Sequence, residues 1–352
     1  EARGSISLRE DGGLIKVSLT DLRAGPANEF AIDVEPLQET GMALRIQGKS
    51  LDASRIFGDS EKAAPAAPTQ DRSLTWKDPL QVTLRLDRIL FKNDQSFRNV
   101  SGNVTLAANE RITGFGLDAL GPGENKIKGM FSVDNGVRNL SLDADDAGAF
   151  INTFTGFTSI RGGSLQTRVS FPPDSGPRAV DYTGTVTLND IVVTEQPFLA
   201  RLFAAGSLDG PLRLLQGEGI RITRMSAPFS SQGRVVTIHE GRASGPSVGG
   251  TFEGVVDRRT DTIGLSGTMV PAYGINSMLG AVPILGDILA SRKGEGVFGV
   301  TYAMKGPLDD PTLTVNPLSV LTPGILRRIF EFKTPEAPPQ ESEGQQPQAA
   351  AP

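Results

Sequence analysis

Two glycine-rich motifs are the parts of this sequence most able to do chemistry. Residues 294–299 read GEGVFG and match the G-x-G-x-x-G spacing of a dinucleotide-binding loop. That loop needs a strand before it and a helix after it, because the helix N-terminus holds the pyrophosphate. Here the glycines follow a helix-like segment and open a strand-like one. A turn that begins a strand is therefore the better interpretation.

The second motif is GPSVG at 245–249, which has the G-x-S-x-G spacing around a nucleophilic Ser247. Such a serine requires a following helix and a histidine further along the chain. The chain's single histidine, His239, precedes the motif, and the strand-like segment 251–256 follows it. A glycine-rich hairpin is predicted instead of a hydrolase site.

Metal and carboxylate chemistry are not indicated either. With one histidine and no cysteine, the chain cannot supply a histidine–cysteine metal site. The aspartates at 143–146 and 309–310 fall at expected turns and helix starts, where capping and turn formation account for them. We therefore expect no metal, no cofactor and no enzymatic activity.

The composition favours short strands and turns over a helical bundle. The 352 residues include 41 glycines and 24 prolines, and aromatic residues make up only 6%. The net charge of −5 is mild and the charges are interspersed, so no basic face for nucleic acid is expected. No apolar run of about 18 residues occurs, so no membrane-spanning helix is predicted.

Period-two alternation predicts many strands, each with one apolar face. In the segment 81–86, apolar residues at 82, 84 and 86 alternate with polar or charged ones. The same alternation recurs at a spacing of roughly 10–15 residues, which indicates about sixteen strands in a meander without crossover helices. The candidates for lining one continuous apolar surface are Val82, Leu84, Leu86, Val104, Leu106, Phe131, Val133, Val186, Leu188, Ile220 and Ile222.

The predicted fold is mainly β, an elongated and twisted antiparallel sheet that forms an open, taco-like groove. In one row, about sixteen strands would extend about 75 Å. Apolar strand faces can also pack on a second sheet or close a barrel, and these alternatives stay open. The expected organisation is an upstream β segment at 1–58, an Ala/Pro-rich loop at 59–70, β repeats at 71–263 with helices near 145–156 and 196–205, a helical C-terminal cap within 264–331 and a disordered tail at 332–352.

The C-terminal segment carries two apolar helix patterns, with Pro283 expected to kink the first and Pro323 to begin the second. Such helices either seal the end of the sheet or meet a membrane, as basic amphipathic helices do. The candidate cap or membrane residues are Ile275, Met278, Leu279, Leu285, Ile288, Leu289, Ile325, Leu326, Ile329 and Phe330.

These segments also carry a family resemblance. Residues 269–289 (MVPAYGINSMLGAVPILGDIL) and 294–332 (GEGVFGVTYAMKGPLDDPTLTVNPLSVLTPGILRRIFEF), with DDAGAFINTFTGFTSIRGGSLQ upstream, resemble the C-terminal region of the AsmA-like superfamily, in particular its YhdP-type branch. The resemblance implies a bridge-like lipid transfer protein of the Gram-negative periplasm, anchored in the inner membrane by an N-terminal helix. Since this chain begins at Glu1 inside a strand pattern, we expect it to be the C-terminal part of such a protein.

The expected function is non-enzymatic transport of phospholipid between membranes, which would support the lipid homeostasis and permeability barrier of the outer membrane. Its partners would be phospholipid acyl chains along the groove and a membrane at the C-terminal helices, with no nucleic acid. An alternative is a structural or assembly factor that docks an envelope protein partner. A third hypothesis, an enzyme acting on envelope glycans, would need a cleft with clustered carboxylates.

Overall fold

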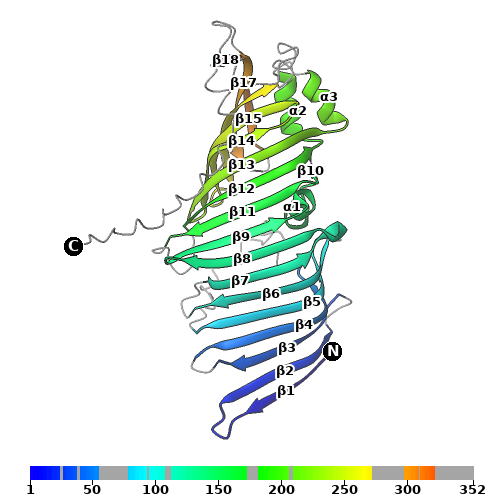
Figure 1. The fold of residues 1–352 in the computed structure, drawn as a ribbon, viewed down its shortest axis with the longest axis vertical. Coiled ribbons are helices and arrows are strands. Elements are labelled where there is room, and N and C mark those ends of the chain that lie inside the picture. The colour runs from blue at the N-terminus through cyan, green and yellow to red at the C-terminus, as the bar shows by residue number, and fades with distance from the viewer. Residues whose placement is uncertain are drawn as a thin grey trace, which may run out of the picture.

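One large β-sheet forms the body of the chain in the computed structural model (Figure 1). The structure describes all residues except 24–26, 38–39, 55–77, 93–94, 108–111, 173–180, 206–208, 272–296, 309 and 322–352. The prediction of a mainly β fold is confirmed. The strands lie side by side in one sheet and follow one another along the longest axis of an elongated molecule (Figure 1).

The described residues contain eighteen strands and three α-helices. The strands are β1 (Ala2–Leu8), β2 (Leu14–Arg23), β3 (Glu29–Pro36), β4 (Met42–Asp52), β5 (Leu80–Leu90), β6 (Ser96–Leu106), β7 (Ile112–Leu120), β8 (Lys126–Asp134), β9 (Val137–Ala144), β10 (Ile160–Arg161), β11 (Ser164–Phe171), β12 (Tyr182–Val193), β13 (Ile220–Gln232), β14 (Val235–Ser244), β15 (Val248–Asp257), β16 (Thr262–Pro271), β17 (Val297–Pro307) and β18 (Thr312–Leu321). The helices are η2 (Pro122–Glu124, a 3₁₀ turn), α1 (Ala147–Thr155), α2 (Pro197–Ala205) and α3 (Asp209–Gln216).

Neighbouring strands pair in chain order, with one parallel exception. Short β10 and longer β11 both pair with β12, and β11 also pairs with β9. Strands β4 and β5 pair in parallel, so the prediction of an antiparallel sheet throughout is wrong at this position. A parallel pair needs a connection long enough to return the chain to the starting end of the sheet, and residues 53–79 provide that length.

The two faces of the sheet differ in polarity because the strand registers bring apolar residues of neighbouring strands onto the same face. Directly paired residues share a face, so one row can be followed from strand to strand. From β2 to β13 this row is Leu19, Ile32, Ile46, Leu84, Gly102, Leu117, Gly129, Leu142, Thr167, Val186 and Ala227. We call this side the apolar face.

Among the described residues, three strands contain a non-glycine residue with left-handed backbone, and one of these residues is Glu240 in β14, with φ 38°. Asn99 in β6 has φ 50° and Asp190 in β12 has φ 53°, a conformation that Asn and Asp tolerate better than other non-glycine residues. Leu188 and Ile191, three positions apart, are consequently both buried on either side of Asp190. The strand end beyond the irregularity thereby contributes apolar side chains to the same core as the part before it.

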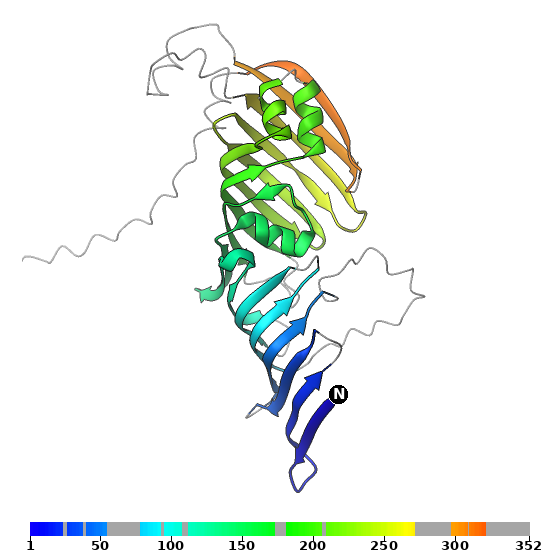
Figure 2. The same cartoon turned by 90° about the vertical axis from the view of Figure 1, so that its right-hand side faces the viewer.

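All three α-helices lie at the same end of the strands (Figures 1 and 2). Helix α1 begins after Asp146, whose Oδ1 accepts a hydrogen bond from the Ala149 backbone N–H at 2.9 Å, and ends at the left-handed Gly156. Helices α1 and α2 fall within the ranges expected for helices. Helix α3 was not predicted, since its Gly-Pro start reads as a turn.

The hydrophobic core follows these helices along one long side of the sheet. Phe203 of α2 and Leu215 of α3 are at most 1% exposed and belong to the same cluster as Ile191 and Ile220 at the strand ends. Helix α3 contacts β13 and α2 contacts β18, although these strands are five positions apart in the sheet. The C-terminal half of the sheet therefore curves around the helix pair (Figure 2).

Candidate functional site

The candidate lining residues of β5 to β12 share the apolar face. Val82 pairs with Val104, and Leu80 pairs with Leu106 at the neighbouring position. Phe131 pairs with Leu140, which pairs with Val169 of β11. Residues from strands far apart in the sequence are thereby brought onto one surface.

Four of the eleven candidates are core residues and do not line an open surface. Leu86, Leu188, Ile220 and Ile222 are at most 8% exposed and belong to the core cluster that includes the helix residues Phe203 and Leu215. The structure places these four in the core, and the lining role stays a prediction for the other seven. Alternation identified their face, but it contains no information on which part of that face the helices cover.

The other seven candidates remain accessible. Val133 is 54% exposed, and the rest are half-buried. Together with half-buried neighbours that the sequence analysis did not select, they form what we call the apolar strip: Val82, Leu84, Val104, Leu106, Phe115, Leu117, Phe131, Val133, Leu140, Leu142, Val186, Phe229, Ile238 and Leu265. Phe115 and Leu117 were missed although they alternate with Gly114, Gly116 and Asp118, a signal that could have identified them.

Aromatic rings lie over glycines of the neighbouring strand on the apolar face. A Cβ added to Gly129 would be 2.5 Å from Phe115 Cε1, and one added to Gly184 would be 2.7 Å from Phe229 Cζ. Phe252 covers Gly241 in the same way. Each glycine leaves the space that the neighbouring ring fills, as in aromatic rescue of strand glycines. Aromatic ring carbons therefore cover the backbone at these glycines.

One charged side chain, Arg138, also belongs to the apolar face. It pairs in register with Val133 and Phe171, is 2% exposed, and lies with its guanidinium carbon 5.5 Å from the centre of the Phe171 ring. A cation over an aromatic face is stabilised by the ring quadrupole. The charge of Arg138 is therefore buried, and the accessible part of the strip stays apolar.

The motifs that resembled catalytic sites have structural roles. Ser247 is buried in the turn between β14 and β15, as the hairpin interpretation predicted. His239 Nε2 lies 2.7 Å from the Oγ of Ser230 on the neighbouring strand. Residues 297–299 of the GEGVFG motif lie in β17, and the preceding glycines lie outside the described residues.

Two of the aspartates expected at turns and helix starts have interactions within the fold. Asp146 caps α1, and Asp143 forms an ion pair with Arg168 at 2.9 Å.

Burial raises the pKa of Tyr302, which therefore stays protonated and donates to the backbone oxygen of Thr251 at 3.3 Å. Within the described ranges, no three His, Cys, Asp or Glu side chains are grouped closely enough to hold a metal ion.

The candidate cap or membrane residues lie outside the described residues. These are Ile275, Met278, Leu279, Leu285, Ile288, Leu289, Ile325, Leu326, Ile329 and Phe330. Among the helices that the structure does describe, none has the length and apolar character needed to span a bilayer.

Comparisons with known proteins do not assign the chain to a family. No protein-family model, curated protein or solved structure matches it. The candidate site therefore rests on the apolar strip itself: a set of mostly partly buried apolar side chains next to a helix-covered core.

Proposed function

We propose that this chain carries phospholipid between membranes of the bacterial envelope by shielding acyl chains along the apolar strip. The observation that supports this most strongly is the position of the helices. They cover only one end of the strands, so most side chains in the middle rows of the apolar face are only partly buried from β5 to β16. Exposed apolar surface of this extent is typical of an interaction site.

The energetics suit a lipid occupant. Removing an acyl chain from water gains about 0.8 kcal/mol for each CH₂ group that is buried. The eleven strands that the apolar strip crosses, β5 to β16 without the short β10, lie about 4.8 Å apart and give a path on the order of 50 Å along the sheet. A lipid acyl chain that moves along this path stays in contact with apolar side chains, so no nucleotide or metal is required for the movement.

In this proposal the sheet forms an open groove. Its curvature around α2 and α3 supports the idea, because the apolar face lies on the side that carries the helices (Figure 2). The apolar segments 275–289 and 323–330 would act as a C-terminal cap that contacts a membrane. The AsmA-like resemblance supports a location in the periplasm of a Gram-negative bacterium, with an inner-membrane anchor preceding this chain.

Native mass spectrometry of protein purified without detergent tests the lipid proposal. We expect co-purified phospholipid with the unaltered chain and its loss in Leu84→Asp and Val186→Asp, because a charge on the strip would have to be desolvated against the acyl chain. Thr187→Asp is the matched control, since residue 187 follows residue 186 on the opposite face. An unaltered protein without lipid would contradict the proposal.

A further inference from the structure

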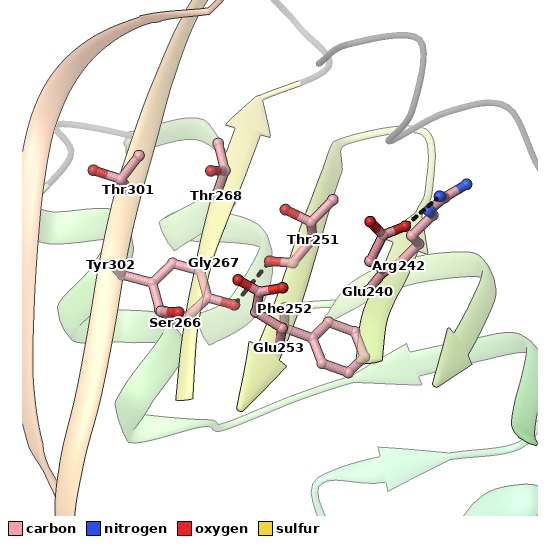
Figure 3. Close-up of a pocket in the computed structure, with 10 residues that line it drawn as sticks. All are labelled: Glu240, Arg242, Thr251, Phe252, Glu253, Ser266, Gly267, Thr268, Thr301 and Tyr302. Atoms are coloured by element: carbon pink, nitrogen blue, oxygen red, sulfur yellow. Dashed lines mark hydrogen bonds and ion pairs between the residues drawn. The ribbon is translucent and has the colours of Figure 1, made fainter. Parts of the chain in front are cut away.

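A polar hollow crosses β14 to β17 at the C-terminal end of the sheet (Figure 3). Its volume is about 380 Å³, which is within the range of small-molecule sites. The lining residues are Glu240, Arg242, Thr251, Phe252, Glu253, Ser266, Gly267, Thr268, Thr301 and Tyr302.

The strand registers place hydroxyl groups side by side in this hollow. Thr268 pairs with Thr251 on one side and with Thr301 on the other, and Thr251 pairs with Arg242. Glu253 and Ser266 form the next polar pair. These residues alternate with Phe252, Gly267 and Tyr302, which belong to the rows of the apolar face, so the hydroxyls belong to the opposite, polar face.

Several of these hydroxyls are available to a ligand. Within the part of the chain that the structure describes, the side-chain oxygens of Thr251, Ser266 and Thr268 make no hydrogen bond to protein. A hydroxyl both donates and accepts, and a row about 4.8 Å apart on adjacent strands presents several such groups in one direction. This arrangement suits a ligand that itself carries several hydroxyl groups.

The charges in the hollow favour an uncharged ligand. Arg242 Nη2 lies 3.3 Å from Glu240 Oε2, so these two charges are paired with each other. Glu253 adds a second carboxylate without a second cation among the lining residues. An anionic ligand would be repelled by this excess negative charge, whereas a neutral hydroxyl can donate to a carboxylate.

We propose that this hollow binds an uncharged glycan. The free hydroxyls of Thr251, Ser266 and Thr268 supply donors and acceptors, and Glu253 accepts from sugar hydroxyls. The site lies on the face opposite the apolar strip and does not depend on lipid transport. A protein that spans an envelope compartment could use it to contact a polysaccharide while the other face holds lipid.

Titration with three neutral trisaccharides, cellotriose, maltotriose and N,N′,N″-triacetylchitotriose, followed by saturation-transfer NMR, tests the inference. We expect at least one of them to bind with a dissociation constant of about 1 mM or lower. Thr268→Val removes one hydroxyl at nearly constant shape and should weaken binding about threefold to tenfold. Thr187→Val is the matched control, since Thr187 continues the same polar row through Ser226 but lies outside the hollow.

The inference is overturned if none of the three sugars binds, or if Thr268→Val and Thr187→Val change the affinity equally. The outcome is separable from that of the proposed function. If the protein co-purifies with phospholipid but binds no trisaccharide, only the glycan-site inference is rejected. If it binds a trisaccharide but holds no lipid, only the transport proposal is rejected.

Discussion

Leu84 and Leu86 show how one strand can contribute to two different kinds of surface. They are the same residue type, on the same face of β5, two positions apart. Leu86 is 3% exposed and belongs to the core, whereas Leu84 is half-buried and belongs to the apolar strip. The two leucines differ in exposure because Leu86 lies nearer than Leu84 to the helix-covered end of the strands. Apolar character alone therefore does not distinguish core residues from accessible ones in this fold.

The covered end is built by close backbone contact. The backbone N–H groups of Ala147 and Gly148 donate to the carbonyl oxygens of Gly163 and Gly162 at 2.8 and 3.2 Å. A Cβ on Gly148 would lie 2.5 Å from the Ile160 carbonyl oxygen, so only glycine permits this approach. No such docking covers the apolar strip among the described residues.

The largest expected effect comes from truncating the covered leucine. Leu86→Ala should lower the free energy of unfolding by about 2–5 kcal/mol, because it leaves a cavity in a packed core. Leu84→Ala is the control on the accessible side, and we expect less than half that loss. Denaturant titration of both variants gives the comparison. Equal losses would show that the strip is packed like the core.

A smaller effect is expected from Gly148→Ala at the docking point of α1. The added methyl meets backbone atoms of Ile160 and Arg161, which cannot move aside as a side chain can. We expect a loss of about 1–3 kcal/mol, in the range of overpacked cores. If thermal unfolding is unchanged, the close approach of α1 to β10 does not define the covered region.

Removing the cap of α1 should cost less again. Asp146→Ala deletes the acceptor of the Ala149 N–H and should destabilise the chain by about 1 kcal/mol. Asp146→Asn is the control, because Asn caps nearly as well and should retain most of the stability. Chemical denaturation distinguishes the two. A loss of the same size in both variants would assign the effect to charge and not to capping.

The smallest effect is predicted at the hairpin ends, away from the helices. The side-chain hydrogen bonds from Arg259 lower the pKa of Asp257 to about 2, below its ordinary value of about 3.9. Because the folded pKa is depressed, the stabilisation is present above about pH 4 and is lost as the pH falls towards 2. Asp257→Asn should remove this small dependence of the unfolding midpoint on pH. An identical pH profile in both proteins would contradict it.

Local pattern predicted the strands and their apolar face well, since period-two alternation needs only neighbouring residues. The segment 81–86 and the segments around Phe131 and Val186 were assigned to strands for this reason. Asp146 was among the aspartates expected at a helix start, and α1 and α2 fall within the ranges predicted for helices. These features depend on a few adjacent residues.

The remaining features depend on contacts distant in sequence. Whether Leu188 is covered depends on α2 and α3, and the parallel pairing of β4 and β5 depends on the path of a long connection. The left-handed Asn99 and Asp190 shift the alternation, and no signal in the strand pattern marks them. The polar hollow required the register of four strands, which no single segment contains.

Site-specific photocrosslinking at positions 186 and 187 tests the central claim most directly. A photoreactive residue is introduced at Val186 on the apolar strip or at Thr187 on the polar face, and crosslinked lipid is measured by mass spectrometry after irradiation in cells. The account predicts phospholipid adducts at position 186 and none at position 187. Adducts at neither position, or equally at both, would contradict a lipid path along the apolar strip.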